Sequence, residues 1–183
     1  MFFRSAIVIA ALVMATGHAE AAEPSFQDSL SGAVLCKRDP LGTVRAIAGS
    51  KSSTFERGIA TLTFGEAMME KNILILRKPI VIAGARTSSI ILSLEGSSYS
   101  NFSGIVYGIF EGDFKSVVKE LGLRAVPATS EVRVGKYDRP LAEKYTSCPK
   151  TIGLTPLAEK GKFLLGCGSV SYTHLTLPTI YSV

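Results

Sequence analysis

Residues 72–111 read NILILRKPIVIAGARTSSIILSLEGSSYSNFSGIVYGIFE, and this stretch decides the fold. Apolar runs of strand length occupy 72–76, 80–83, 88–95 and 102–111. Short turns rich in Gly and Ser separate consecutive runs, which predicts antiparallel pairing of neighbours. Pro79 has no backbone N–H to donate, so we expect 80–83 to be a separate strand or to continue 72–76 past an edge position or a bulge.

The residues that follow this stretch predict the clearest helix of the chain. Asp113 is a candidate N-cap, because its carboxylate can accept from the first free backbone N–H groups. Apolar residues then recur at helical spacing from Phe114 to Leu121. Gly122 follows them and is suited to end the helix. The apolar face of this helix is expected to pack on the sheet.

Two further helices are expected before the strands. Apolar residues recur at helical spacing over 26–37. Asp39 followed by Pro40 is typical of an N-cap and first helical residue, which predicts a short helix over 40–48. Additional strands are predicted at 58–64, 131–134 and 162–167, and the polar region 135–161 is expected to be mostly loop.

The composition is that of a folded globular chain. Of its 183 residues 46% are hydrophobic and 19% are charged, and this length suits one domain. Together with the predicted elements it indicates a single α+β domain, with an antiparallel β-sheet and two or three short helices packed mainly on one face.

The N-terminus has the organisation of a secretory signal peptide. Arg4 precedes an uncharged apolar run over 5–16, and the A-x-A pattern ends at Ala21. Residues 1–21 are therefore expected to be cleaved, leaving an exported protein in the periplasm or outside the cell. No later apolar stretch is long enough to span a membrane, so the mature chain is expected to have no transmembrane segment.

The C-terminus differs from the rest of the chain. Residues 170–179 read VSYTHLTLPT, which resembles the conceptual translation of a sequencing adapter, although Tyr, Thr and Leu would also suit a strand. We expect 170–183 to be non-native and the exported domain to span 22–169. The native sequence after about Gly168 would then be missing.

Both histidines, His18 and His174, lie outside 22–169. This excludes Ser-His-Asp and Cys-His catalysis within that range and removes the commonest transition-metal ligand. Three widely spaced cysteines without a C-x₂₋₄-C pair also make a zinc site unexpected. We therefore expect neither a metal nor a cofactor.

The cysteines of an exported protein usually pair. The favoured pair is Cys36–Cys148, which would stabilise the fold by about 4–5 kcal/mol on the chain-entropy model. Cys148–Cys167 is the next alternative. Because three is an odd number, Cys167 is expected to be unpaired through loss of a partner in the missing C-terminus.

One catalytic motif needs consideration. Ser116 and Lys119 match the S-x-x-K nucleophile motif of penicillin-recognising enzymes. The K-T-G motif that accompanies it is absent, because Ile152 follows Lys150 and Thr151. Short motifs occur by chance, so we expect these two residues to lie on an exposed helix face. The alternative is an envelope hydrolase that uses Ser116 and Lys119, or residues of the lost C-terminus.

A pair of carboxylates, Glu111 and Asp113, could also be considered as a glycosidase pair. A strand-ending Glu beside a helix-capping Asp is the commoner arrangement, and the chain has no Trp to line a sugar site.

The formal net charge of +5 is spread along the chain. This charge would suit an anionic envelope polymer, although a solvated surface that keeps the chain soluble is its commoner meaning. The lack of interleaved aromatic residues argues against nucleic acid. The expected function is that of a small exported, non-enzymatic protein that binds an envelope protein or an anionic envelope polymer.

Overall fold

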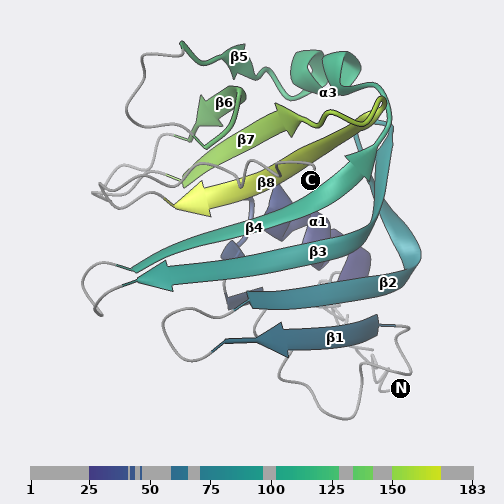
Figure 1. Cartoon of the computed structure of the whole chain (residues 1–183), viewed down its shortest axis with the longest axis vertical. Helices are drawn as coiled ribbons and strands as arrows, with labels where there is room; N and C mark the ends of the chain where they lie inside the picture. The colour runs from purple at the N-terminus through teal and green to yellow at the C-terminus, as the bar shows by residue number, and fades with distance from the viewer. Residues whose placement is uncertain are drawn as a thin grey trace, which may run out of the picture.

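Eight strands form one antiparallel sheet in the computed structural model (Figure 1). The structure describes residues 25–40, 42–43, 46, 59–65, 71–96, 102–127, 134–141 and 150–169. The elements are α1 (Phe26–Val34), β1 (Ile59–Phe64), β2 (Lys71–Ile82), β3 (Ala85–Gly96), β4 (Phe102–Glu111), α3 (Phe114–Glu120), β5 (Arg124–Ala125), β6 (Tyr137–Pro140), β7 (Lys150–Pro156) and β8 (Lys162–Ser169). The predicted antiparallel sheet is confirmed. The α+β class holds in outline, with strands more dominant than expected.

The strand order β1-β2-β3-β4-β8-β7-β6-β5 divides the sheet into two meanders. β1 to β4 are neighbours both in sequence and in space. The chain then reaches the far edge as β5 and returns through β6 and β7 to β8, which pairs with β4. Two segments far apart in sequence therefore meet at the centre of the sheet (Figure 1).

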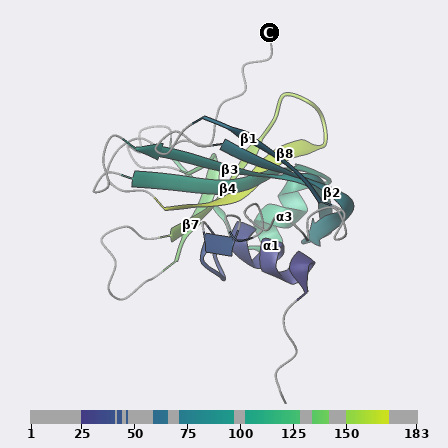
Figure 2. The ribbon, with the colours of Figure 1, turned by 90° about the horizontal axis from the view of Figure 1, so that it is seen from below.

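The main hydrophobic core contains side chains from both meanders, from α1 and from α3. α1 contributes Leu30, Ala33 and Val34, all fully buried, and α3 contributes Val117. The largest core side chains of the strands include Leu74, Ile90, Leu92, Phe110, Ile152, Leu154, Phe163 and Leu165. In the view of Figure 2, α1 and α3 lie below β1 to β4.

A second, smaller cluster lies on the other face of the sheet. It consists of Ile105, Tyr107, Val134 and Leu164, all at most 4% exposed. Because side chains of a strand alternate between faces, β4 and β8 contribute to both clusters and are buried on both sides. This places β4 and β8 at the centre of the packed molecule.

α1 begins and ends with capping interactions. Ser25 accepts from the backbone N–H of Asp28 at 3.2 Å. At the other end, the N–H of Lys37 donates to Gly32 and that of Cys36 donates to Ala33, which is a Schellman arrangement. Cys36 occupies the left-handed position of this motif, with φ of 55°, where glycine is the usual residue.

α3 confirms the helix predicted after β4. The Asp113 carboxylate accepts from the backbone N–H groups of Lys115 and Ser116. Gly122 ends the helix with φ of 62°, and the N–H of Leu123 donates to Val118. Capping groups and an apolar stripe close together in sequence made this helix predictable.

The helix expected over 40–48 is described only at residues 40, 42–43 and 46, and these are helical. Asp39 caps it as predicted, since its carboxylate accepts from the N–H of Gly42 at 3.0 Å and its carbonyl accepts from Thr43.

The region 135–161 was expected to be mostly loop, and it contains two strands that the sequence did not predict. This region contains β6 and all of β7. Four consecutive residues of β7, 151–154, are buried, so the alternation of polar and apolar residues that marks a half-exposed strand is missing. Gly153 and the prolines at both ends obscured it further. Of the strand expected at 131–134, only Val134 is described, and it lies in a bend.

The signal peptide expected over 1–21 and the adapter-derived tail expected over 170–183 lie outside the described residues. Both remain predictions. Among the described residues, no helix is both long enough and apolar enough to cross a membrane.

Candidate functional site

The sheet bends where two irregularities coincide. In β2 the register with β3 shifts between Ile75 and Ile80, around Pro79. In β3 the register with β4 shifts between Arg86 and Ile90. Pro79 therefore lies in an irregular part of one continuous strand, the second of the two arrangements that the sequence left open. Bulges of this kind redirect side chains locally.

A row of side chains crosses four strands beside the bend. Val81 of β2 pairs with Arg86 of β3, which pairs with Glu111 of β4, which pairs with Lys162 of β8. The Glu111 carboxylate lies 3.6 Å from Arg86 Nη2 and 4.0 Å from Lys162 Nζ. Glu111 thus bridges two cations that reach it from opposite neighbours.

The closest ion pair of this group is made outside the row. Lys162 Nζ lies 2.8 Å from the carboxylate of Glu159. This hydrogen bond and the attraction to the Glu159 charge raise the pKa of Lys162 above its ordinary value, with a smaller contribution from Glu111. Lys162 is therefore a cation at neutral pH.

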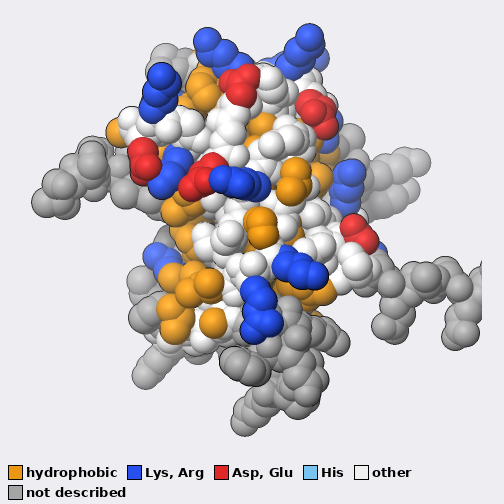
Figure 3. Space-filling model, turned by 90° about the vertical axis from the view of Figure 1, so that its right-hand side faces the viewer, with side chains coloured by type: hydrophobic (Ala, Val, Ile, Leu, Met, Phe, Trp, Pro, Cys, Tyr) orange, Lys and Arg blue, Asp and Glu red, His pale blue; other side chains and the backbone are white. Residues whose placement is uncertain are grey.

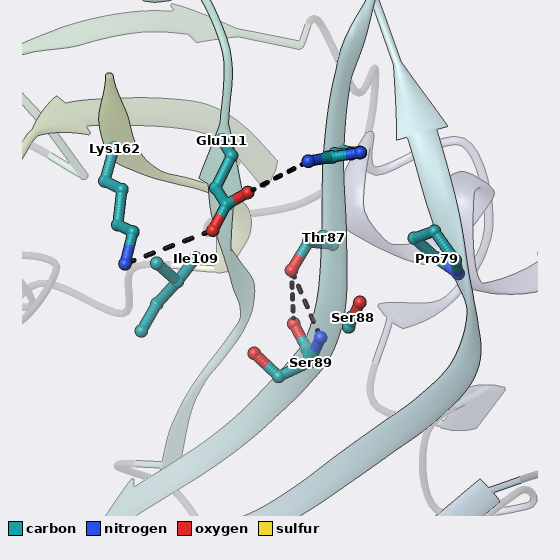
Figure 4. Close-up of a pocket in the computed structure, with 8 residues that line it drawn as sticks. Pro79, Thr87, Ser88, Ser89, Ile109, Glu111 and Lys162 are labelled. Carbon is teal, nitrogen blue, oxygen red and sulfur yellow. Dashed lines mark hydrogen bonds and ion pairs between the residues drawn. The ribbon is translucent and has the colours of Figure 1, made fainter. Parts of the chain in front are cut away.

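A hollow of about 360 Å³ opens beside these charges (Figure 4). It is lined by Pro79, Arg86, Thr87, Ser88, Ser89, Ile109, Glu111 and Lys162. Its polar groups are thus two cations, one carboxylate and three hydroxyls, and its apolar groups are a proline ring and an isoleucine. Its volume is near the lower end of the range for small-ligand sites.

Thr87 holds the bulged wall of the hollow in place. Its side chain is almost fully buried, at 3% exposed. Its hydroxyl donates to the Ser89 carbonyl at 2.9 Å and accepts from the Ser89 N–H at 3.2 Å (Figure 4). These bonds satisfy backbone groups that the bulge removes from the ladder.

Exposed apolar side chains form a separate feature. Leu62, Ile75 and Val81 are large hydrophobic residues with 46%, 45% and 63% of their surface exposed. Leu62 lies on β1, at the edge of the sheet, and the other two lie on the neighbouring β2. On the side of the molecule where β2 turns into β3, charged side chains of both signs lie among hydrophobic side chains, and a further group of hydrophobic side chains lies at the lower left of the view (Figure 3).

The candidate catalytic pair lies on α3 and does not line the hollow. Ser116 and Lys119 are both exposed. The Ser116 hydroxyl donates to Asp113 Oδ2 at 2.6 Å, so its proton is directed at a capping carboxylate. This bond and the backbone N–H of Lys115 lower the pKa of Asp113. Ser116 thus has a structural task in the helix cap.

The two carboxylates considered as a glycosidase pair have separate tasks in the structure. Glu111 bridges Arg86 and Lys162, and Asp113 caps α3. Within the described part of the chain, no group of three His, Cys, Asp or Glu residues is arranged to hold a metal ion.

The disulfide joins a pair that the sequence did not favour. Cys36 is bonded to Cys167, with Cα atoms 5.3 Å apart. This corrects both the favoured Cys36–Cys148 pair and the alternative Cys148–Cys167, and Cys167 is not the unpaired cysteine. Cys148 lies outside the described residues. The physical reason is that α1 packs against the central strand β8, which brings the end of the helix over the inward-facing Cys167.

Sequence reasoning missed Arg86 and Lys162 as partners in one site. The sequence indicated only that β2 is irregular at Pro79, and it did not indicate the register shift of β3 beside Arg86. The position of Lys162 depends on the pairing of β8 with β4, for which no local pattern exists.

Comparisons with known proteins identify neither a family nor a function for the chain. No protein-family model, no curated protein and no solved structure matches the chain.

Proposed function

We propose that this chain is a small exported, non-enzymatic protein that binds an envelope component in the hollow at the sheet bend. The observation that carries the proposal is the composition of the hollow. Two cations, a carboxylate and three hydroxyls belong to residues that line about 360 Å³, with apolar groups beside them. A concave site with a few convergent polar groups is the usual form of a ligand site.

Export is supported by the Cys36–Cys167 bond. Disulfides persist in oxidising compartments and are rare in the cytosol. The signal-peptide pattern over 1–21 points the same way. An envelope component would be accessible to a protein in that compartment.

Binding is favoured over hydrolysis by the groups present. A serine nucleophile needs a base that takes its proton, whereas the Ser116 hydroxyl donates to the capping Asp113. The hydroxyls in the hollow belong to Thr87, Ser88 and Ser89, and the one carboxylate that lines it, Glu111, is paired with Arg86 and Lys162. Neither Arg nor Lys in its charged form can accept a proton.

A partner protein is the second candidate, on a different observation. Leu62, Ile75 and Val81 leave large apolar surfaces exposed on adjacent strands. Exposed apolar patches are typical of protein contact sites. Such a partner would lie on the β1–β2 end of the sheet.

The test compares two sites in the full exported chain. Purified envelope polysaccharides and lipopolysaccharide are titrated against the wild type, Arg86→Gln and Lys119→Ala. We expect Arg86→Gln to weaken binding roughly tenfold or more, since a charge-assisted hydrogen bond contributes about 1.5–3 kcal/mol. Lys119→Ala removes the same charge on α3 and should leave binding unchanged.

Equal weakening by both variants would contradict the proposal, because it would indicate attraction by overall charge. A fluorophosphonate or labelled β-lactam that modifies the wild type and not Ser116→Ala would establish the hydrolase instead. Pull-down of an envelope protein by the wild type and by Arg86→Gln, but not by Leu62→Ser, would favour the partner protein.

A further inference from the structure

The charge balance around the hollow selects the kind of anion it can bind. Arg86 and Lys162 face Glu111, and Lys162 is also paired with Glu159. The four groups are formally two positive and two negative. The two carboxylates would repel a dianion, such as a phosphate monoester, more strongly than a monoanion. A ligand with a single negative charge also needs only one of the two cations as its partner.

Arg86 is the cation available to a ligand. The Arg86–Glu111 separation of 3.6 Å exceeds the 2.7–2.9 Å of a charge-assisted hydrogen bond. The Arg86 side chain is also 69% exposed. Its planar guanidinium carries five N–H donors in a fork that matches a carboxylate. Lys162 is already engaged at 2.8 Å by Glu159.

The rest of the hollow suits a ring that carries hydroxyls. Ser88 and Ser89 line it next to Arg86, and a serine hydroxyl can both donate and accept. Pro79 and Ile109 offer apolar surface to the C–H groups of such a ring (Figure 4). The wall is held by the buried Thr87 hydroxyl, so the site is formed before a ligand arrives. Preorganisation of this kind lowers the cost of binding.

On the basis of the function proposed above, we propose that the hollow binds a sugar unit with a single carboxylate, as in a polymer of hexuronic acid. The ligand carboxylate lies on the Arg86 guanidinium, where it competes with Glu111. The sugar hydroxyls face Ser88 and Ser89, and the ring lies between Pro79 and Ile109.

The experiment titrates the full exported chain with three probes by calorimetry. These are a galacturonate oligomer, the same oligomer with its carboxylates methyl-esterified, and inorganic phosphate. We expect the wild type to bind the free oligomer at least tenfold more tightly than the ester, and phosphate not to compete.

Two variants at the hollow should act in opposite directions. Arg86→Gln is expected to weaken binding of the galacturonate oligomer roughly tenfold or more. Glu111→Gln is expected to strengthen this binding several-fold, because it removes the competing carboxylate while keeping the side-chain shape. A merely structural role of the Arg86–Glu111 pair would move both variants in the same direction. Arg124→Gln on β5 is the matched control for loss of one positive charge and should change nothing.

Equal binding of ester and acid, or effective competition by phosphate, would overturn the ligand class. If no galacturonate binds but Arg86→Gln abolishes binding of another envelope polymer, the sugar class is wrong and the hollow remains the site. If Arg86→Gln changes no binding at all, the proposed function is wrong as well.

Discussion

At the scale of single residues, two threonines on β1 contribute differently to the stability of the fold, because only one of their hydroxyls has a hydrogen-bond partner. The Thr61 side-chain oxygen is buried without a hydrogen-bond partner among the described residues, and Thr61 pairs with the fully buried Leu74. The Thr63 hydroxyl donates to Asn72 Oδ1 at 2.7 Å. A buried, unpaired polar group costs free energy, whereas a satisfied one contributes.

We expect Thr61→Val to raise the free energy of unfolding by about 1 kcal/mol and Thr63→Val to lower it by about the same amount. Valine keeps the β-branched shape in both cases, so strand propensity changes little. Urea denaturation of the two variants checks this. A Thr61→Val protein as destabilised as Thr63→Val would show that the Thr61 hydroxyl has a partner.

At the scale of elements, β8 fits between its neighbours because two of its positions lack a side chain. A Cβ at Gly166 would meet the Val106 carbonyl oxygen and the Tyr107 backbone, with Tyr107 Cα at 2.7 Å. A Cβ at Gly168 would meet side chains only, with the closest atom, Val134 Cγ1, at 3.1 Å. Backbone of a central strand cannot move aside as a side chain can.

Gly166→Ala should therefore destabilise the protein by about 1–3 kcal/mol, the usual cost of overpacking. Gly168→Ala, on the same face two residues later, should cost less. Thermal unfolding by circular dichroism measures both. Equal melting temperatures for the two variants would mean that β4 and β8 are less tightly paired than the structure has them.

At the scale of the whole molecule, one covalent bond joins the start of the described chain to its end. The Cys36–Cys167 bond spans 131 residues. It links the end of α1 to the central strand β8, so it encloses almost the whole sheet within one loop. Closing a long loop restricts the unfolded chain more than the folded one.

Replacing both cysteines by alanine is expected to lower the free energy of unfolding by about 5 kcal/mol on the chain-entropy model. A Cys36→Gly, Cys167→Ala variant should lose less, by up to about 1 kcal/mol, because Gly adopts the left-handed conformation of residue 36 without a steric cost. Chemical denaturation compares the variants. Mass mapping without reduction checks the pairing, and a peptide joining Cys36 to Cys148 would contradict it.

Most strands and the helices were predictable because their patterns are local. Patterns within a few neighbouring residues indicate the strand at 102–111, the cap at Asp113 and the helix-ending glycine at 122. β7 was not predictable, because Thr151 to Leu154 are buried on both faces and show no alternation. The S-x-x-K pair at Ser116 and Lys119 was found from spacing alone, and the structure shows the serine in a helix cap.

The sequence was sufficient for the first meander, for α3 and for the presence of an irregularity at Pro79, since propensity, capping and turn residues act over short distances. The sequence alone could not show that β8 pairs with β4. That pairing brings Lys162 to Glu111 and Cys167 under the end of α1. Pairing of distant strands depends on burying both faces of β4 and β8 at once, and that free energy exists only when the whole sheet is assembled.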